Sequence, residues 1–586
     1  MSVYRAPAED MLFVLEEIAG RPDIATLPGF EDASADIVAA IIEEAGKLGT
    51  DVLDPLNQSG DSEGCTFENG VVRTPTGFKE AYQQFIDGGW NSMPFDPEYG
   101  GQGLPWLIST ATSEIWHAAN MSFGLCPLLT GGAAELLSEH GSDALKSVYL
   151  EKMISGVWTG SMNLTEPHAG SDLARIRTKA THDGDNYRIS GQKIFITYGE
   201  HDFTDNIVHM VLARTPGGPE GIKGISLFVV PKVLVNEDGS LGARNDLRCA
   251  SIEHKMGINA SPTAVMLYGE NEGAIGYLVG EENRGIEYMF TMMNNARLAV
   301  GLEGVAIAER AYQRARAFAE DRAQGRAIGD KSQEVVSIIH HPDVKRMLLS
   351  MRSQTEAVRA LAYYVAGNLD VAHRHENSDA AKKAQAFVDL LTPVVKAWST
   401  DVGVDVANTG IQIHGGMGFI EETGAAQHFR DARIAPIYEG TNGIQANDLA
   451  ARKIGREGGV TAKQLISEMR ASLESMASSH ARMSSAIDAL ERATDWIVET
   501  YEKDPETALA GAVPYLRLMG ITVGGWLMVR SLEIVQQKRD QYPDFADRKL
   551  ASVRYFARYT LTEAEGLAIA VTEGSSSITQ TALKDL

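Results

Sequence analysis

The stretch YRISGQKIFITYG, residues 187–199, decides the fold class of this chain. Apolar and polar residues alternate over most of it, which is typical of a half-buried strand. Four similar runs lie nearby, separated by turns rich in Gly, Asp and Pro: TGSMNLTE (159–166), NIVHMVLAR (206–214), GISLFVVPK (224–232) and TAVMLYGE (263–270). Residues 156–278 are therefore predicted to form a small antiparallel β-domain.

Helical patterns flank this β-domain on both sides. Apolar residues recur three or four positions apart in four long segments: 36–48, 294–321, 347–369 and 382–409. After Gly459 the same spacing continues over 465–497, which indicates further helices that pack as a bundle on the body or on another subunit. The chain is expected to be mainly α with a central β-domain, in four parts: 1–155, 156–278, 279–455 and 456–586.

Composition narrows the possible partners. The net charge of −25 over 586 residues argues against nucleic acid and anionic membranes, because their phosphates would be repelled. The three cysteines form no CxxC pair, which argues against a disulfide framework and a zinc site and suits a reducing, cytoplasmic compartment. The first twenty residues show no signal-peptide pattern, and no window of 18 uninterrupted apolar residues predicts a membrane span.

Two motifs in the predicted β-domain could bind a ligand. In SMNLTEPHAGSD (161–172), exposed N–H groups and the hydroxyls of Thr165 and Ser171 could hold a polar ring edge or a phosphate, although a capped β-turn would look the same. In GQKIFITYG (191–199), Phe195 and Thr197 would share one face of a strand. An aromatic ring beside a hydroxyl suits a flat heteroaromatic cofactor, and the alternative is an ordinary core aromatic.

A glycine pair follows the fourth long helical segment, 382–409. In QIHGGMGF (412–419), Gly415 and Gly416 would let the backbone come close to a pyrophosphate. The motif is no dinucleotide-binding fingerprint, because a helix precedes it and no βαβ unit follows. A glycine-rich helix stop is the competing interpretation, and His414 is more typical of a packed or capping histidine than of a catalyst.

The last motif is RDARIAPIYEGTNGIQ, residues 430–445. Glu439 lies at a turn after largely apolar residues, so its carboxylate could have a raised pKa and act as a base. The alternative is an acid in the N-terminal region of the following helix, where it would favour the helix dipole. The residues alone leave both interpretations open.

Together and in this order, the motifs resemble those of the acyl-CoA dehydrogenase family. The resemblance covers roughly residues 75–450 and rests on six segments: EYGGQGLP (98–105), NLTEPHAGSD (163–172), GQKIFITYG (191–199), HKMGINAS (254–261), HGGMGF (414–419) and IYEGTNGIQ (437–445). It implies a helical N-domain, a β-barrel middle domain and a four-helix C-domain, here with extra C-terminal helices. It also implies FAD, partly bound against a second subunit of a homodimer or dimer of dimers.

The resemblance assigns cofactor contacts to named residues. Leu164, Thr165, Gly170 and Ser171 would line the flavin, Phe195 and Thr197 would cover its ring, and Thr441 would touch it; Gln412, Gly415 and Gly416 would approach the ADP portion, and Arg322 and Gln324 would face the pyrophosphate. The chain departs from the family at three positions: it has Phe195 where the family often has Trp, Gly325 where the family usually has Phe, and Gly443 where many members have Gln.

The resemblance also places the catalytic base. Some family members carry a glutamate on an earlier helix, immediately before the equivalent of Arg297, but this chain has Ala296 there. The other family position is filled by Glu439, which would take the α-proton of an acyl thioester while the β-hydride passes to flavin. Arg297 would help to order the Glu439 loop, or would form a helix salt bridge instead.

The long C-terminal extension narrows the resemblance further. FITYGEHD (195–202) and the run 414–445 look like a bacterial subgroup that oxidises 3-methylmercaptopropionyl-CoA during dimethylsulfoniopropionate breakdown. The subgroup also contains dehydrogenases of plain short- to long-chain acyl-CoAs, and both would pass electrons to an electron-transfer flavoprotein. Less favoured alternatives are an acyl-CoA oxidase and an acyl-CoA-binding protein that has lost catalysis.

Overall fold

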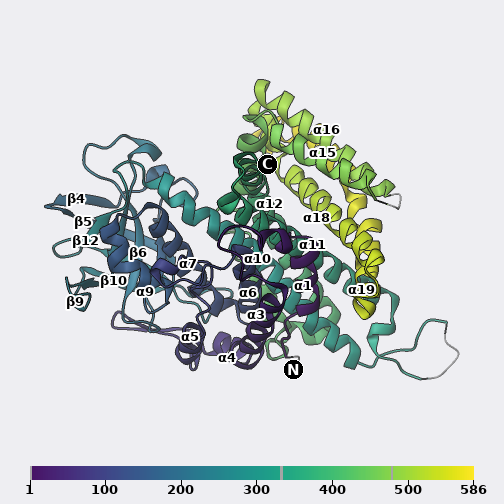
Figure 1. Cartoon of the computed structure of the whole chain (residues 1–586), viewed down its shortest axis with the longest axis horizontal. Coiled ribbons are helices and arrows are strands. Elements are labelled where there is room, and N and C mark those ends of the chain that lie inside the picture. Colours follow the sequence, from purple (N-terminus) through teal and green to yellow (C-terminus); the bar gives the residue numbers. More distant parts are fainter. Residues whose placement is uncertain (1–2, 330–333, 477–479, 586) are drawn as a thin grey trace. The chain divides into compact units, whose positions relative to one another are not determined.

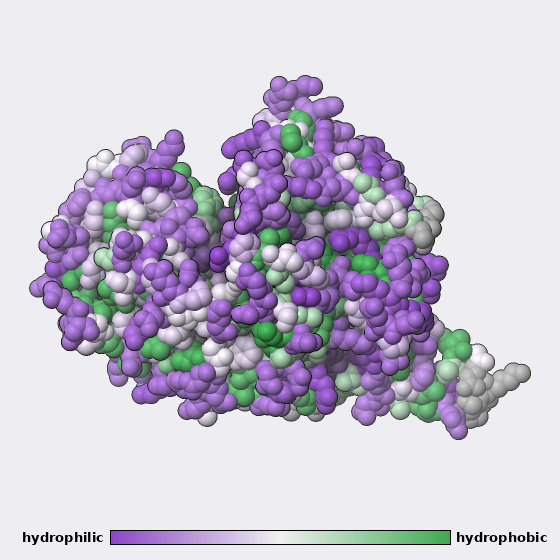
Figure 2. Space-filling model, viewed as in Figure 1, coloured by the Kyte–Doolittle hydropathy of each residue, from purple (hydrophilic) through white to green (hydrophobic). Residues whose placement is uncertain are grey.

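The computed structural model describes residues 3–329, 334–476 and 480–585 and divides into two compact units. Unit 1 comprises 1–46, 105–118 and 297–586, and unit 2 comprises 47–104 and 119–296. The chain therefore crosses between the units several times, and three helices contain a crossing point: α3 (Ala35–Leu48), α6 (Trp106–Ala119) and α10 (Gly285–Asp321). In the view of Figure 2, hydrophilic residues cover most of the visible surface, as expected from the net charge of −25.

Unit 2 contains the β-domain, whose strands lie together in Figure 1. Its strands are β1 (Thr66–Glu68), β2 (Val71–Arg73), β3 (Thr159–Asn163), β4 (Lys179–Asp183), β5 (Asn186–Thr197), β6 (Ile207–Ala213), β7 (Ser226–Pro231), β8 (Val233–Val235), β9 (Leu241–Arg244), β10 (Leu247–Ile252), β11 (Thr263–Tyr268) and β12 (Ala274–Leu278). Its helices are α4 (Asp54–Glu63), α5 (Phe78–Asp87), α7 (Met121–His140), α8 (Asp143–Leu145) and α9 (Glu151–Ile154).

Eight of these strands form one sheet in the order β10-β11-β5-β12-β7-β6-β3, with β4 also paired to β5. The expected antiparallel arrangement holds except for β3 and β6, which pair in parallel. Every residue of β6 and β7 is buried, and these strands are largely apolar, whereas β5 alternates over much of its length. Among the described residues, strand pairing runs from β10 to β3 without closing on itself.

Strand β5 contains a bulge that matters for the site. Ile196 pairs with Ala264 and Lys193 pairs with Met266, so β5 carries one residue more than β11 between these pairs. Bulges re-aim side chains and often lie beside functional sites. Phe195 lies in this bulge with a φ of +60°, in the left-handed region that side chains other than Gly rarely adopt.

Unit 1 is helical. Besides parts of α3, α6 and α10 it contains α1 (Ala8–Glu17), α2 (Arg21–Ile24), α11 (Pro342–Arg374), α12 (Ser378–His414), α13 (Ala425–Ala432), α14 (Asn442–Asn447), α15 (Val460–Glu474), α16 (Ala481–Lys503), α17 (Pro505–Ala510), α18 (Ala512–Gln537), α19 (Pro543–Arg558), α20 (Ala564–Ile569) and α21 (Ser575–Thr579). The four long helical segments predicted from sequence fall within α3, α10, α11 and α12, and the later repeats form α15 and α16. The predicted fold class, mainly helical around a central β-domain with extra C-terminal helices, is confirmed.

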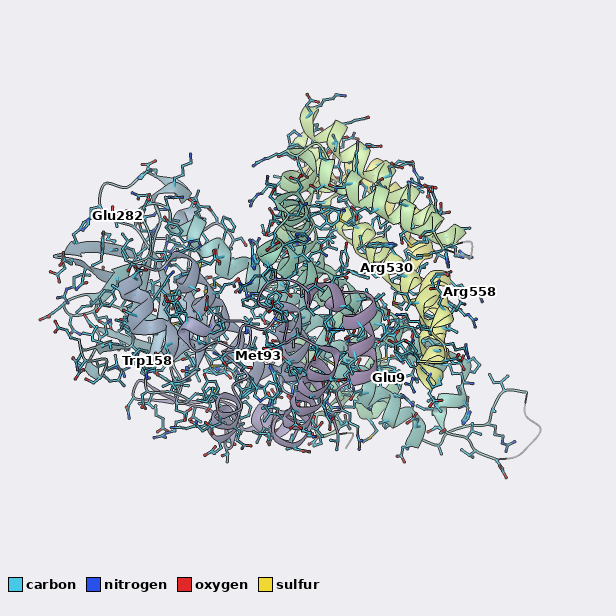
Figure 3. The ribbon with its side chains drawn as sticks, viewed as in Figure 1. Glu9, Met93, Trp158, Glu282, Arg530 and Arg558 are labelled. Carbon is cyan, nitrogen blue, oxygen red and sulfur yellow. The ribbon has the colours of Figure 1, made fainter. Side chains whose placement is uncertain are left out.

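Helix α18 is the most apolar helix of the C-terminal part. By length and composition it could cross a membrane, but 83% of its most apolar window is buried inside the structure, as in the core helix of a folded domain. It packs against α11, α12 and α19. Arg530, labelled in Figure 3, belongs to this helix. Its guanidinium carbon lies over the ring of Trp526, 5.0 Å from the ring centroid.

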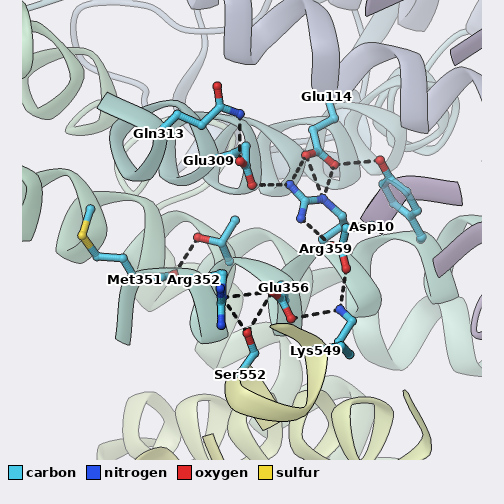
Figure 4. A network of polar contacts seen from close by, with 12 residues as sticks. Asp10, Glu114, Glu309, Gln313, Met351, Arg352, Glu356, Arg359, Lys549 and Ser552 are labelled. Carbon is cyan, nitrogen blue, oxygen red and sulfur yellow. Dashed lines mark hydrogen bonds and ion pairs between the residues drawn. The ribbon is translucent and has the colours of Figure 1, made fainter. Parts of the chain in front are cut away.

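A cluster of buried charges ties α1 and α19 to the centre of unit 1 (Figure 4). We call it the Arg359 cluster; its members are Asp10, Glu114, Glu309, Glu356, Arg359 and Lys549. The Arg359 guanidinium pairs with Glu114 at 2.6 Å, Asp10 at 2.7 Å and Glu309 at 2.8 Å. Lys549 of α19 pairs with Asp10 of α1 and, at 3.0 Å, with Glu356 of α11. Both chain extensions are therefore integral parts of this unit.

Candidate active site

Glu439 lies in the loop between α13 and α14, on a backbone with a φ of +55°. For a residue other than glycine this conformation costs on the order of 1–3 kcal/mol, and such strain clusters at active sites. Two hydrogen bonds hold the loop: Gln445 Nε2 donates to the Glu439 carbonyl at 2.9 Å, and Asn442 N donates to the Pro436 carbonyl at 3.0 Å. The surrounding structure thus enforces the strained conformation.

The capping interpretation of Glu439 is wrong. The residue that caps α14 is Thr441, whose Oγ1 accepts a hydrogen bond from Ile444 N at 3.2 Å. Glu439 lies two residues before this cap and is not one of the helix's first-turn residues. Its carboxylate is therefore left for another role.

The surroundings of Glu439 adjust its acidity towards neutral pH. Burial raises the pKa of its carboxyl to about 7, against the opposing pull of the Arg297 and Lys396 charges. A carboxyl with a pKa near the working pH can both accept and release a proton, which is what general base catalysis requires. The geometry and the electrostatics agree in making Glu439 the strongest candidate base.

Of the two interpretations that the sequence left open for Arg297, the salt bridge is present in the structure. Arg297 is 8% exposed on α10, and its Nη1 lies 3.7 Å from Asp448 Oδ2, so it forms an ion pair with a following element. Its charge also lowers the pKa of Glu439. Ala296, which occupies the alternative base position, is an almost fully buried alanine.

Sequence reasoning missed three residues beside Glu439. Lys396 of α12 donates from Nζ to the Gly440 carbonyl at 2.7 Å and to Asn442 Oδ1 at 2.9 Å. Tyr438 donates from its hydroxyl to Glu303 Oε2, and Glu303 on α10 is only 1% exposed. The one available signal was a lone carboxylate in an apolar helical run, VGLEGVA (300–306).

In unit 2 the structure brings the two β-domain motifs side by side. The Leu164 carbonyl accepts a hydrogen bond from Lys193 Nζ at 2.9 Å, and the Thr165 carbonyl accepts one from Ile194 N at 2.9 Å. Phe195, next along the chain, is 59% exposed, so the core-aromatic interpretation is wrong. An exposed aromatic ring on a strained bulge is the kind of surface that a flat ring system covers.

Three further candidates, Thr197, Gly170 and Ser171, also lie in unit 2. Thr197 is partly buried at the end of β5, while Gly170 and Ser171 are exposed. A Cβ built on Gly170 would meet nothing within 4 Å, so the backbone there is open to a ligand. The donors and the aromatic surface fit a cofactor with a polar-edged, flat ring.

The phosphate-facing candidates all lie in unit 1. Gln412 is exposed on the last turn of α12, and Gly415 follows with a φ of +60°. A Cβ on Gly415 or Gly416 would meet nothing within 4 Å, which leaves room for close approach of an anionic group. His414 is a packed histidine, as expected: it is buried, bonded to the Gly410 carbonyl at 2.7 Å and stacked on Phe318.

Arg322 and Gln324 lie just after α10 and interact with each other. Arg322 Nη2 donates to Gln324 Oε1 at 2.9 Å, and both side chains are exposed, so the arginine can still reach an anion. Gly325 adopts a φ of +75°, which a phenylalanine rarely would. The local backbone therefore explains why this chain has no phenylalanine there.

The structure shows no candidate metal centre within its described ranges. No group of three or more His, Cys, Asp and Glu side chains there is arranged to hold a metal ion. Cys65, Cys126 and Cys249 are free thiols. Acid–base chemistry at Glu439 is the chemistry that the described residues do support.

Comparison with family models assigns all parts of the chain except its two ends and short linkers. Residues 63–157, 161–270 and 283–454 match the N-terminal, middle and C-terminal domains of acyl-CoA dehydrogenases, and 465–582 match a model described as acetyl-CoA dehydrogenase C-terminal like.

Full-length relatives support the same assignment. The 3-methylmercaptopropionyl-CoA dehydrogenase of Ruegeria pomeroyi is 48% identical over 98% of this chain and 99% of its own length. A broad-specificity linear acyl-CoA dehydrogenase of Mycobacterium tuberculosis is 32% identical over 95% of each chain. An acyl-CoA dehydrogenase of Bacillus anthracis, solved with FAD, shares the fold with a TM-score of 0.76 at 20% identity, over 99% of this chain and 93% of its own.

Proposed function

The chain belongs to the acyl-CoA dehydrogenase family and is an FAD-dependent oxidoreductase, and from this premise we propose that Glu439 is the base that removes the α-proton of an acyl-CoA thioester. The observation that carries the proposal is the partly buried Glu439, whose backbone is strained and whose carboxyl pKa is raised to about 7. Proton abstraction by such a placed base typically contributes roughly 10²–10⁴-fold to the rate.

The reaction oxidises the Cα–Cβ bond of the acyl chain. The α-proton passes to a Glu439 oxygen, the β-hydrogen leaves as hydride, and the product is the trans-2-enoyl thioester. When bound, FAD supplies the hydride acceptor. The positive charges of Arg297 and Lys396 lower the pKa of Glu439 and so increase the fraction of molecules in which its carboxyl is ionised.

Several residues would hold FAD. In unit 2 they are Leu164, Thr165, Gly170, Ser171, Phe195 and Thr197; in unit 1 they are Arg322, Gln324, Gln412, Gly415, Gly416 and Thr441. The support is the exposed Phe195 ring, the open glycine backbones and the exposed Arg322, a local cation in an acidic chain. Because the Thr441 hydroxyl caps α14, any flavin contact of this residue has to share that oxygen.

We propose 3-methylmercaptopropionyl-CoA as the substrate and methylthioacryloyl-CoA as the product. The support is the 48% identity to the Ruegeria pomeroyi enzyme over nearly the whole chain. A straight-chain acyl-CoA is the second candidate, since the relative from Mycobacterium tuberculosis is named for linear acyl-CoAs. Both candidates use the same base and cofactor and differ only in the acyl chain.

Anaerobic flavin reduction across an acyl-CoA panel tests the proposal. The panel contains 3-methylmercaptopropionyl-CoA, butyryl-CoA and octanoyl-CoA, and we expect the thioether substrate to bleach the flavin fastest. Faster bleaching by octanoyl-CoA would move the assignment to fatty acyl-CoA oxidation. Failure of every thioester to bleach the flavin would overturn the dehydrogenase proposal.

The same preparation tests the electron acceptor and the compartment. We propose that an electron-transfer flavoprotein reoxidises the enzyme in the cytoplasm, which suits the three free cysteines. Turnover should then need added electron-transfer flavoprotein. Rapid oxygen consumption without it would point to an acyl-CoA oxidase instead.

We propose that the chain assembles as a homodimer or a dimer of dimers. The segment after α12 exposes three apolar side chains close together: Met417 at 49%, Phe419 at 85% and Ile420 at 45%. Such apolar exposure favours burial against another copy. Light scattering should give a mass of two or four chains, and a monomer would contradict the proposal.

A further inference from the structure

Two side chains from neighbouring helices hold the backbone on either side of Glu439. Tyr438, the residue before it, donates its hydroxyl to Glu303 of α10. Gly440, the residue after it, has its carbonyl held by Lys396 of α12 at 2.7 Å. The base is therefore flanked by two anchors that come from different helices.

The Lys396 anchor extends into α14. Lys396 Nζ also donates to Asn442 Oδ1, and the Asn442 amide donates to the Ala397 carbonyl at 3.0 Å and to Asp401 at 2.7 Å. Asn442 is the first residue of α14, so the start of this helix is fixed to α12. The loop that carries the base cannot shift without breaking these bonds.

The Glu303 anchor is unusual because its carboxyl is almost completely buried. Glu303 Oε2 accepts from Tyr438, and Oε1 has no hydrogen-bond partner within the described residues. A buried polar atom without a partner destabilises the fold. If stability were the only requirement, an apolar residue would therefore be preferred at this helical position. The retention of a carboxyl here indicates a role beyond packing.

Glu303 does not add a second negative charge near Glu439, because its own carboxyl is protonated. Burial raises the pKa of its carboxyl to about 8, so Glu303 keeps its proton near neutral pH and acts as a neutral acceptor for Tyr438. The charged and titratable groups around the two carboxyls are Arg297 on α10, Lys396 and Asp401 on α12, Tyr438 in the loop, and Asp448 and Arg452 after α14.

We propose that Glu303 and Lys396 are positioning residues for the dehydrogenation, holding Glu439 in its strained conformation through Tyr438 on one side and Gly440 on the other. The inference rests on the proposed function, since it requires Glu439 to be the base. Neither residue needs to touch the substrate. Both act by fixing where the Glu439 carboxylate lies.

The test compares side chains of similar volume at position 303. Glu303→Leu removes the acceptor, whereas Glu303→Gln keeps a neutral acceptor for the Tyr438 hydroxyl. We expect Glu303→Leu to lower the limiting rate of anaerobic flavin reduction by about 10- to 100-fold, because small displacements of a catalytic group have effects of this order. Glu303→Gln should recover the rate to within about threefold of wild type, with acyl-CoA affinity similar in both.

Tyr438→Phe gives a milder disruption of the same contact and carries the test if Glu303→Leu fails to fold. Its matched control is Tyr542→Phe, which removes another tyrosine–glutamate hydrogen bond, 3.0 Å long, from the residue before α19 to Glu17 of α1. We expect Tyr438→Phe to lower the limiting rate without a matching loss of acyl-CoA affinity. Tyr542→Phe should leave the rate unchanged.

Two results would overturn the positioning role. One is a wild-type rate in Glu303→Leu or Tyr438→Phe; the other is a Glu303→Gln rate as low as that of Glu303→Leu, which would mean that the proton itself is needed. Glu439→Gln, measured alongside, separates this failure from that of the proposed function. If Glu439→Gln still bleaches normally, the base assignment fails, and if it is inactive while Glu303→Leu is fast, only the positioning role fails.

Discussion

Unit 1 buries charge in two places, and the two clusters are built in opposite ways. In the Arg359 cluster every carboxylate that surrounds the arginine has a cationic partner within 2.8 Å. At the Glu439 loop, the cations Arg297 and Lys396 act on the base only through space, and the nearby Glu303 leaves one oxygen without a hydrogen bond in the described structure. One cluster is paired tightly, and the other is not.

The pKa values follow this difference only in part. In the Arg359 cluster the ion pairs hold the pKa of Asp10 below its usual value despite burial and raise that of Lys549, whereas burial raises the pKa of Glu114 and Glu356. At the Glu439 loop burial prevails at both carboxyls and raises the pKa of Glu439 to about 7 and that of Glu303 to about 8. The close ion pair of Asp10 with Lys549 keeps both groups charged, as a structural contact requires. Weaker compensation at Glu439 lets its carboxyl gain and lose a proton near neutral pH, as general base catalysis requires.

The largest expected effect is the loss of the base itself. Glu439→Gln keeps the size of the side chain but removes its ability to accept a proton, so flavin bleaching by substrate should fall by roughly 10²–10⁴-fold. Stopped-flow flavin absorbance under anaerobic conditions measures this rate. Acyl-CoA and FAD binding should persist. Normal flavin bleaching in this variant would contradict the assignment of Glu439 as the base.

The next effect should appear in stability rather than in rate. Arg359→Leu leaves Asp10, Glu114 and Glu309 buried without their shared cation, and breaking a buried ion pair in this way typically costs about 3–5 kcal/mol. Chemical unfolding should show this loss, while folded molecules should retain most of their flavin-reduction rate. A fully stable variant would mean that the pairing contributes nothing.

A smaller effect concerns the pH dependence of the reaction. Since Glu439 must be deprotonated to act, kcat/KM should rise with pH around a midpoint of about 7 and fall below it. Lys396→Met removes a positive charge that lowers this pKa, so the midpoint should move upward. It also removes the anchor of the Gly440 carbonyl, so the limiting rate at high pH should fall as well. Rates measured between pH 5.5 and 9 check this, and a downward shift would contradict the electrostatic account.

The smallest effect is expected for an exposed ion pair, which serves as the reference for the two buried clusters. Arg539 and Asp547 form an exposed ion pair at 2.6 Å, with their side chains 51% and 73% exposed. Arg539→Ala should change the free energy of unfolding by less than about 1 kcal/mol, because water and salt screen exposed pairs. A loss as large as that of Arg359→Leu would remove the distinction between buried and exposed pairing.

The sequence predicted the order of the elements and a candidate base. Strand alternation and helical periodicity are local, so residues 187–199 and the segments of α10 to α12 could be identified directly. The apolar residues before Glu439 indicated a possible base but left a helix-terminal acid equally open, and the family resemblance favoured the base. The parallel pairing of β3 with β6 could not be foreseen, since it joins segments that are more than 40 residues apart.

Contacts between distant helices explain what the sequence did not reveal at the site. Lys396 and Glu303 lie 43 and 136 residues from Glu439 and carry no motif of their own. The same holds for Arg359, which reads as one polar residue of a long helix until Asp10, Glu114 and Glu309 converge on it. Phe195 was interpreted from an ideal strand, and only the structure shows the bulge that exposes it.

The left-handed backbone at Glu439 has a consequence for protein engineering. Glycine adopts a φ of +55° without the steric cost that a glutamate side chain incurs. A library randomised at this position and selected for heat resistance should therefore enrich glycine, and every enriched clone would be inactive. Directed evolution of this enzyme towards thermostability needs an activity screen in each round, because at this position thermostability favours glycine whereas the proposed activity requires glutamate.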